Sequence, residues 1–181
     1  MTNKKDLRAV CRAKRKNIEN KAEKSSEIVE RALELSQVTE AESWFIFYPL
    51  KDEVDLLPLF EIAKKRVKKI AFPLCDDKDG NMSFREVCLL DELAEGYFGL
   101  REPSADAPEM LPQNAVIFLP ALAIDRQGYR LGYGKGYYDR YLAKYADLKP
   151  FTVGVIYKEL LFDELPRDGF DIPCDTVICD C

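Results

Sequence analysis

The segment that decides the fold runs from Leu119 to Leu142 and reads LPALAIDRQGYRLGYGKGYYDRYL. It begins at the end of an apolar run, 116–119, whose length and composition are typical of a buried strand. It ends in a predicted helix, because Tyr138, Leu142 and Tyr145 recur at the spacing of one helical face. The sequence therefore predicts a strand, a turn, a glycine-rich loop and a helix in succession.

Three alternating glycines, Gly132, Gly134 and Gly136, lie just before this helix. Because glycine has no Cβ atom, the chain there can adopt positive φ and its amides can approach a ligand closely. A loop that enters a helix also presents unpaired N–H groups and the positive end of the helix dipole, which favours phosphate. The spacing matches neither a Walker A loop nor a Rossmann fingerprint. From the glycines alone, a hairpin with tight turns and core tyrosines is an equally good interpretation.

Charged residues close to the glycines favour the phosphate interpretation. Arg130 and Lys135 supply positive charge, one as a planar guanidinium and one as a mobile ammonium. Asp139 places a carboxylate in the first helical turn, where it is suited to hold a magnesium ion on the phosphates. We therefore expect this loop to bind a phosphate group.

The run RLGYGKGYYDR, residues 130–140, follows a proline-ended strand and an aspartate before the turn, and it strongly resembles the motif of the 5-formyltetrahydrofolate cyclo-ligase (5,10-methenyltetrahydrofolate synthetase) family. The resemblance extends from Lys4 to Asp175 and is densest between Pro120 and Leu142. It implies an ATP-dependent ligase that cyclises 5-formyltetrahydrofolate to 5,10-methenyltetrahydrofolate and releases ADP and phosphate. The implied intermediate is an imidate phosphate, formed when the formyl oxygen attacks the γ-phosphate.

Strands and helices alternate along the rest of the chain. Apolar runs predict strands at 43–48, 69–74, 151–157 and 176–179, with a hairpin or edge segment at 82–87. Helices are predicted at 3–16, capped by Asn3, at 20–35, opened by a capping box at Asn20, and at 56–66. We expect a single three-layer α/β domain over residues 1–181, with a mostly parallel sheet, helices on both faces and the glycine-rich phosphate loop.

Net charge, apolar runs, cysteines and the absence of histidine each exclude some classes of function. The net charge of −5 argues against nucleic-acid binding, and no apolar run is long enough to span a membrane. The first residues contain no signal-peptide core, so we expect a cytoplasmic protein with reduced thiols. A zinc site made of Cys174, Cys179 and Cys181 is an alternative whose spacing matches no standard knuckle. The chain has no histidine, which excludes Ser–His, Cys–His and His–metal schemes.

The resemblance also implies roles for individual residues. ATP would be bound by a basic N-terminal element and the loop, namely Lys4, Lys5, Arg8, Arg130, Leu131, Gly132, Tyr133, Gly134, Lys135, Gly136, Tyr137 and Tyr138. The catalytic residues would be Lys135, Arg130 and Tyr137. The folate would be flanked by Tyr48, Glu53, Tyr133 and Tyr137, and Mg²⁺ would be held by Asp139 and Asp171. For Glu53, the alternative is a solvent-exposed loop acid.

Three positions depart from the family pattern and bear on fine substrate preference: Leu56 replaces a threonine, Leu160 a glutamine and Phe170 a histidine. Glu102, in the GYFGLREP run, either lines the site or fixes a turn, and we expect the second. We expect a monomeric enzyme that acts on small molecules. The alternatives are a non-catalytic nucleotide- or folate-binding module, or a scaffold that kept only the fold.

Overall fold

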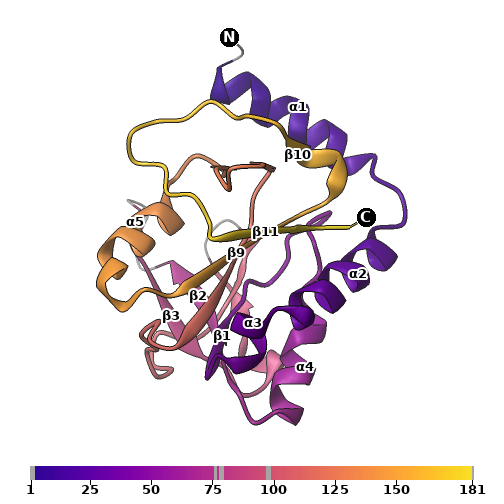
Figure 1. The fold of residues 1–181 in the computed structure, drawn as a ribbon. Coiled ribbons are helices and arrows are strands. Elements are labelled where there is room, and N and C mark those ends of the chain that lie inside the picture. The colour runs from indigo at the N-terminus through magenta and orange to yellow at the C-terminus, as the bar shows by residue number, and fades with distance from the viewer. Residues whose placement is uncertain (1–2, 76, 78–79, 97–98, 181) are drawn as a thin grey trace.

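A six-stranded sheet in the order β11-β9-β6-β1-β2-β3 forms the centre of the structure, a computed structural model that describes residues 3–75, 77, 80–96 and 99–180 (Figure 1). Its strands are β1 (Ser43–Phe45), β2 (Lys69–Cys75), β3 (Met82–Glu86), β6 (Ala115–Leu119), β9 (Phe151–Ile156) and β11 (Thr176–Cys179). All neighbours pair in parallel except β3, which is antiparallel to β2. The predicted, mostly parallel sheet with an edge hairpin is confirmed, although β1 is shorter than expected.

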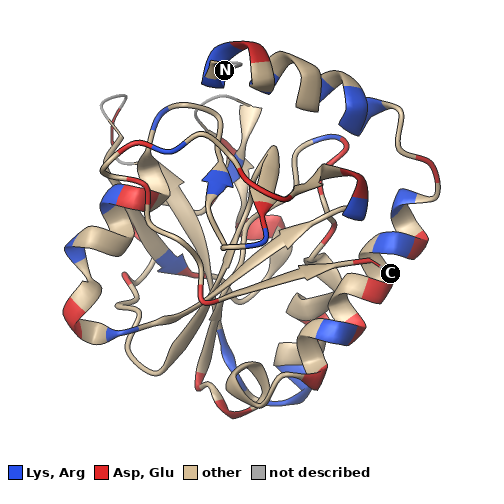
Figure 2. Cartoon of the chain, turned by 45° about the horizontal axis from the view of Figure 1, so that its top comes forward, with Lys and Arg blue, Asp and Glu red and all other residues tan. Residues whose placement is uncertain are grey.

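Helices cover both faces of this sheet. The elements α2 (Lys21–Glu34), α3 (Ser36–Glu40) and α4 (Leu57–Lys65) lie on one side, and α5 (Tyr137–Lys144) lies on the other (Figure 1). The remaining helix, α1 (Lys4–Lys16), crosses above the sheet and carries lysine and arginine near its two ends (Figure 2). The prediction of helices on both faces is thus confirmed.

The two predicted helix caps have different outcomes. The Asn3 side chain accepts a hydrogen bond from the Asp6 amide at 2.9 Å, as predicted for the start of α1. The predicted capping box at Asn20 is wrong, because Asn20 is in the left-handed region with φ 53° and its side chain makes no capping bond. The tight connection between α1 and α2 uses Asn20 for its tolerance of that conformation.

The strands are buried because the sheet is covered on both faces. Every residue of β1 and β6 is buried, as expected for parallel strands between two helical layers. Trp44 is fully buried, and its indole N–H donates to the Val38 carbonyl at 2.8 Å. On the other face, Phe45 contacts Phe84, with ring centroids 4.8 Å apart. This packing fixes the ends of the strands from which the site is built.

Among the described residues, two small sheets accompany the large one. Strands β10 (Leu161–Phe162), β7 (Ala123–Asp125) and β8 (Arg130–Leu131) form one, and β4 (Ala94–Glu95) pairs with β5 (Arg101–Glu102) in the other. Short 3₁₀ turns occupy Leu90–Glu92, Ala146–Leu148 and Lys158–Leu160. In the β7–β8 turn, the buried Asp125 carboxylate accepts the amides of Gln127 and Tyr129 at 2.9 and 3.0 Å. This hairpin leads directly into residues 132–136.

Three of the predicted segments include residues that the structure does not describe. Residues 76 and 78–79 of the predicted acidic turn, residues 97–98 of the GYFGLREP run and Cys181 of the alternative zinc site lie outside them. Within the described residues, no group of three or more Cys, Asp or Glu side chains is arranged to hold a metal ion. In the same part of the chain, no helix is long and apolar enough to cross a membrane.

A glycine in the central sheet provides a test of this packing. A Cβ atom on Gly154 in β9 would lie 2.8 Å from both Cys174 Sγ and Ile124 Cδ1. We expect Gly154→Ala to lower the free energy of unfolding by about 1–3 kcal/mol through overpacking. Gly169→Ala is the control, because its Cβ would meet no atom within 4 Å, and it should change stability by less than about 0.5 kcal/mol. Equal unfolding midpoints in urea for the two variants would contradict this packing.

Candidate active site

Most of the predicted site residues line one cavity of about 410 Å³. It is lined by the segments that follow β1 and β8, by the end of β2, and by β5 with the residue before it. The predicted residues that line it are Tyr48, Glu53, Arg130, Gly132, Tyr133, Lys135, Gly136, Tyr137, Tyr138 and Asp139. A volume of this size is in the range that accommodates a small-molecule ligand.

Residues 132–136 connect β8 to α5 along the cavity wall. Gly134 and Gly136 have φ of 101° and 68°, values that suit glycine and allow the sharp entry into the helix. Arg8 holds this segment from outside by donating from Nε to the Gly132 carbonyl at 2.8 Å. Lys135 is exposed at the cavity, and Leu131 is buried beneath the segment. Residues 132–136 therefore lead from β8 into α5, and the strands β7 and β8 stand between them and the predicted strand β6.

Lys4 and Asp171, predicted to act on phosphate and metal respectively, are paired with each other. The Lys4 ammonium lies 2.6 Å from Asp171 Oδ2 and 2.7 Å from Asp168 Oδ2. Burial alone lowers the pKa of Lys4, but the hydrogen bonds to the two aspartates outweigh it and raise the pKa above its usual value. These residues lie outside the lining of the cavity, and Lys5 is exposed. The N-terminal basic element thus contacts the acidic 168–171 segment.

Arg130 is a buried cation at the cavity. Its side chain is 5% exposed, and Nη2 donates to Asp139 Oδ1 at 2.9 Å. The same oxygen accepts the Ile172 amide at 3.2 Å, so Asp139 lies beside the segment that carries Asp171. The buried Nη1 of Arg130 has no hydrogen-bond partner among the described residues. A buried donor without a partner is costly, and this one suits an anionic ligand.

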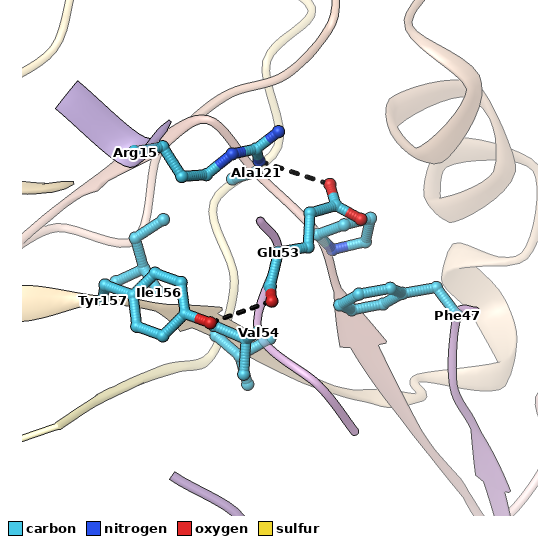
Figure 3. Close-up of a pocket in the computed structure, with 9 residues that line it drawn as sticks. Arg15, Phe47, Glu53, Val54, Ala121, Ile156 and Tyr157 are labelled. Carbon is cyan, nitrogen blue, oxygen red and sulfur yellow. Dashed lines mark hydrogen bonds and ion pairs between the residues drawn. The ribbon is translucent and has the colours of Figure 1, made fainter. Parts of the chain in front are cut away.

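Glu53 is buried rather than exposed, which excludes the alternative of a solvated loop acid. Its side chain is 5% exposed, and Oε1 lies 3.4 Å from Arg15 Nη1 (Figure 3). The Tyr133 hydroxyl accepts from the same Arg15 nitrogen at 2.8 Å and donates to Glu53 Oε1. The second oxygen of Glu53 accepts the Leu50 amide at 2.8 Å. Arg15, Glu53 and Tyr133 form what we call the Arg15 cluster.

Three arginines at or near the cavity were not predicted. Arg15 lies on the buried face of α1, one turn after the buried Cys11. This spacing of four residues places Arg15 on the same helical face as Cys11 and could have indicated from the sequence that Arg15 is buried. Arg12 lines the cavity, 6.0 Å from the Tyr133 ring, and Arg101 lies 5.3 Å from the Tyr48 ring. Nothing in the local pattern of Arg12 or Arg101 distinguishes it from a surface residue.

The remaining predicted residues contact the backbone or the core. The Tyr137 hydroxyl donates to the Asp77 carbonyl at 2.7 Å, and Tyr138 packs edge-on against Phe84. Glu102 is buried, accepts the Cys75 amide at 3.2 Å and also lines the cavity.

The departures from the family motif lie away from the cavity. Leu56 and Leu160 are fully buried in the core, and Phe170 is 90% exposed. None of the three lines the cavity in the described part of the chain.

The Arg15 cluster can be tested through Tyr133. Burial, followed by the nearby Glu53 carboxylate, raises the pKa of Tyr133 well above its usual value. Below about pH 10 the protonated hydroxyl contributes its full stability, which is lost as the pH rises toward the folded-state pKa. We expect wild type and Tyr133→Phe to show equal increases in tyrosinate absorbance between about pH 9 and about pH 11. A smaller increase in the variant would contradict a buried, hydrogen-bonded hydroxyl.

Comparisons with known proteins agree with this geometry. The 5-formyltetrahydrofolate cyclo-ligase of Escherichia coli strain K12 is 29% identical over 163 residues, which cover 88% of this chain and 90% of that protein. The mouse protein of the same name is 26% identical over 170 residues, covering 88% and 84% of the two chains.

Solved structures show the same architecture. The 5,10-methenyltetrahydrofolate synthetase of Aquifex aeolicus has a TM-score of 0.82 and 34% identity, with 97% of this chain and 88% of that chain covered. The synthetase of Mycoplasma pneumoniae has a TM-score of 0.78 with 99% of both chains covered, and at 23% identity it supports the fold alone. A family model matches residues 1–180, and this chain therefore belongs to the 5-formyltetrahydrofolate cyclo-ligase family.

Proposed function

We propose that the chain is a single-domain ligase that cyclises 5-formyltetrahydrofolate to 5,10-methenyltetrahydrofolate at the expense of ATP, releasing ADP and phosphate. The observation that carries the proposal is the composition of the cavity. Arg130, Lys135 and Glu53 all line it. Cations suit the phosphates of ATP, and a carboxylate suits the N–H donors of a pterin. A single cavity therefore offers complementary groups to both substrates.

The phosphate end would be formed by residues 132–136 with Arg130 and Lys135. The unpartnered Nη1 of Arg130 supplies a donor that a phosphate oxygen would satisfy. From α1, Arg8 already reaches the loop, and Lys4 would reach a phosphate by exchanging its aspartate contacts. Catalysis of phosphoryl transfer depends mainly on positioning and on stabilising charge at the transferred group. These residues provide that charge without any histidine.

The carboxylates present are chemically suited to Mg²⁺. Asp139 and the segment bearing Asp171 adjoin through the bond from the Ile172 amide to Asp139 Oδ1. In phosphoryl-transfer sites Mg²⁺ needs only one or two carboxylates besides phosphates and water. We therefore assign Asp139 and Asp171 to hold the ion, which when bound would neutralise phosphate charge.

The folate end would be formed by Glu53 and three tyrosines. Two parallel hydrogen bonds to the Glu53 carboxylate would orient the pterin, and the rings of Tyr48, Tyr133 and Tyr137 would pack against its flat rings or the benzoyl group. In this orientation the formyl oxygen attacks the γ-phosphate to give an imidate phosphate and ADP. N10 then bonds to the activated carbon, the carbon–oxygen bond breaks with departure of phosphate, and the N10 proton is released.

Substitution of the buried arginine tests the proposal. The assay follows the near-ultraviolet absorbance of the methenyl product after mixing protein with 5-formyltetrahydrofolate and Mg-ATP. We expect Arg130→Met and Lys135→Ala to lower kcat/KM by about 100- to 1000-fold, because each removes charge that stabilises the transferred phosphoryl group. Arg126→Met is the matched control, since Arg126 is also paired with an aspartate at 2.9 Å but is 69% exposed. It should leave kcat/KM unchanged.

A flat trace from folded wild-type protein would decide against the proposal. If that protein still bound ATP, the non-catalytic binding module would be the better assignment. An ATP-dependent increase that survives in both Arg130→Met and Lys135→Ala would instead overturn the role given to the loop.

The metal assignment has its own test. We expect Asp139→Asn to raise the Mg²⁺ concentration for half-maximal rate by about tenfold or more, because the amide is a weaker ligand for the ion. Asp163→Asn is the control, since this exposed aspartate pairs with Arg126. Titration of the rate with Mg²⁺ at saturating ATP separates this effect from a lower maximal rate. An unchanged Mg²⁺ requirement would remove Asp139 from the site.

A further inference from the structure

Arg15 is a buried cation that the proposed reaction does not use. Its side chain is 9% exposed, and it lies on the inner face of α1. Burying a guanidinium is costly unless it is paired and hydrogen-bonded. Arg15 lies outside the lining of the 410 Å³ cavity, whereas Arg12, one turn earlier, lines it. Its position therefore calls for a role other than direct contact with the phosphates.

The contacts of Arg15 converge on one carboxylate. Nη1 lies 3.4 Å from Glu53 Oε1 and donates at 2.8 Å to the Tyr133 hydroxyl, which in turn donates to the same oxygen. The guanidinium also lies 5.6 Å from the centre of the Tyr133 ring. Figure 3 shows Arg15 approaching the Glu53 carboxylate from one side. Charge and hydrogen bonding thus act together on Oε1.

The backbone of Glu53 is fixed as well. Its carbonyl accepts the buried Tyr157 hydroxyl at 2.9 Å, and its amide donates to the Leu50 carbonyl at 3.0 Å. With the main chain held on both sides, the direction of the carboxylate depends on its side-chain contacts. Arg15 is the only lysine or arginine paired with Glu53 among the described residues. Removing Arg15 would leave a carboxylate that is 5% exposed without its counter-charge.

We propose that Arg15 is the positioning residue for folate recognition, holding the Glu53 carboxylate oriented for the pterin. The inference rests on the proposed function, because it takes Glu53 as the group that binds the pterin. A carboxylate accepts two parallel hydrogen bonds well only when it is correctly turned. Arg15 acts from behind this contact and does not touch the substrate.

The experiment measures the two ligands separately by calorimetry, without turnover. Wild type, Arg15→Met and Arg15→Lys are titrated with 5-formyltetrahydrofolate alone and with Mg-ADP alone. We expect Arg15→Met to weaken folate binding by about 10- to 100-fold, since it removes charged hydrogen bonds. Mg-ADP binding should change by less than about threefold. Arg15→Lys should restore part of the loss, because it keeps the charge but not the planar fork.

A double-mutant cycle with Glu53→Gln identifies the route of the effect. If Arg15 acts through the Glu53 charge, adding Arg15→Met to Glu53→Gln should weaken folate binding by less than about twofold more. Arg126→Met, in an exposed pair, controls for the loss of any arginine. If Arg15→Met does not fold, judged by circular dichroism and urea unfolding, the same cycle is run with Arg15→Lys and a smaller step is expected.

Failure of the inference can be separated from failure of the proposed function. Wild type that forms no methenyl product and binds no 5-formyltetrahydrofolate overturns the proposed function and the inference with it. Active wild type with normal folate binding in Arg15→Met overturns the inference alone. So does equal weakening of folate and Mg-ADP, or a full Arg15→Met effect in the Glu53→Gln background, because either result indicates a general structural role.

Discussion

The Arg15 cluster joins the three segments on which the cavity depends. Arg15 comes from α1, Glu53 from the loop after β1, and Tyr133 from the connection between β8 and α5. These segments are 38 residues or more apart in the sequence, so no local interaction brings them together. A buried charge pair adds little net stability over an apolar contact, yet losing one partner is costly. The cluster therefore fixes the arrangement of the segments more than it raises the stability of the fold.

The central sheet makes this arrangement possible. Its parallel strands end at the same edge, and ligands of open α/β sheets bind beyond that edge. β1 lies between β2 and β6, and the segments that follow β1 and β6 both line the cavity. Connections through β7 and β8 then bring the loop before α5 to the same place. The buried strands form a rigid base that holds in place the loops whose side chains line the cavity.

The parts that sequence predicted well are those set by local patterns. The apolar run before Pro120 gave β6, because a strand covered on both faces is apolar throughout. The segment before α5 was predicted from glycines whose positive φ is a local requirement. Arg15, by contrast, resembles any residue of a basic helix until its distant partner is known. The pairing of Lys4 with Asp171 was missed for the same reason, since each was assigned to a different ligand.

The charges around the cavity are largely balanced by neighbouring groups of opposite sign. Lys4 is paired with Asp168 and Asp171, and Arg130 with Asp139. A phosphate that binds these cations would therefore compete with the aspartates for them. The displaced aspartates would then be available to a cation that accompanies the phosphate. The cost of desolvating separate ions is avoided, because each ion already has a partner before and after the exchange. The buried Nη1 of Arg130 has no hydrogen-bond partner among the described residues, and a phosphate oxygen could accept from it without breaking an existing contact. By this reasoning, phosphate binding would begin at Arg130 before it displaces any carboxylate.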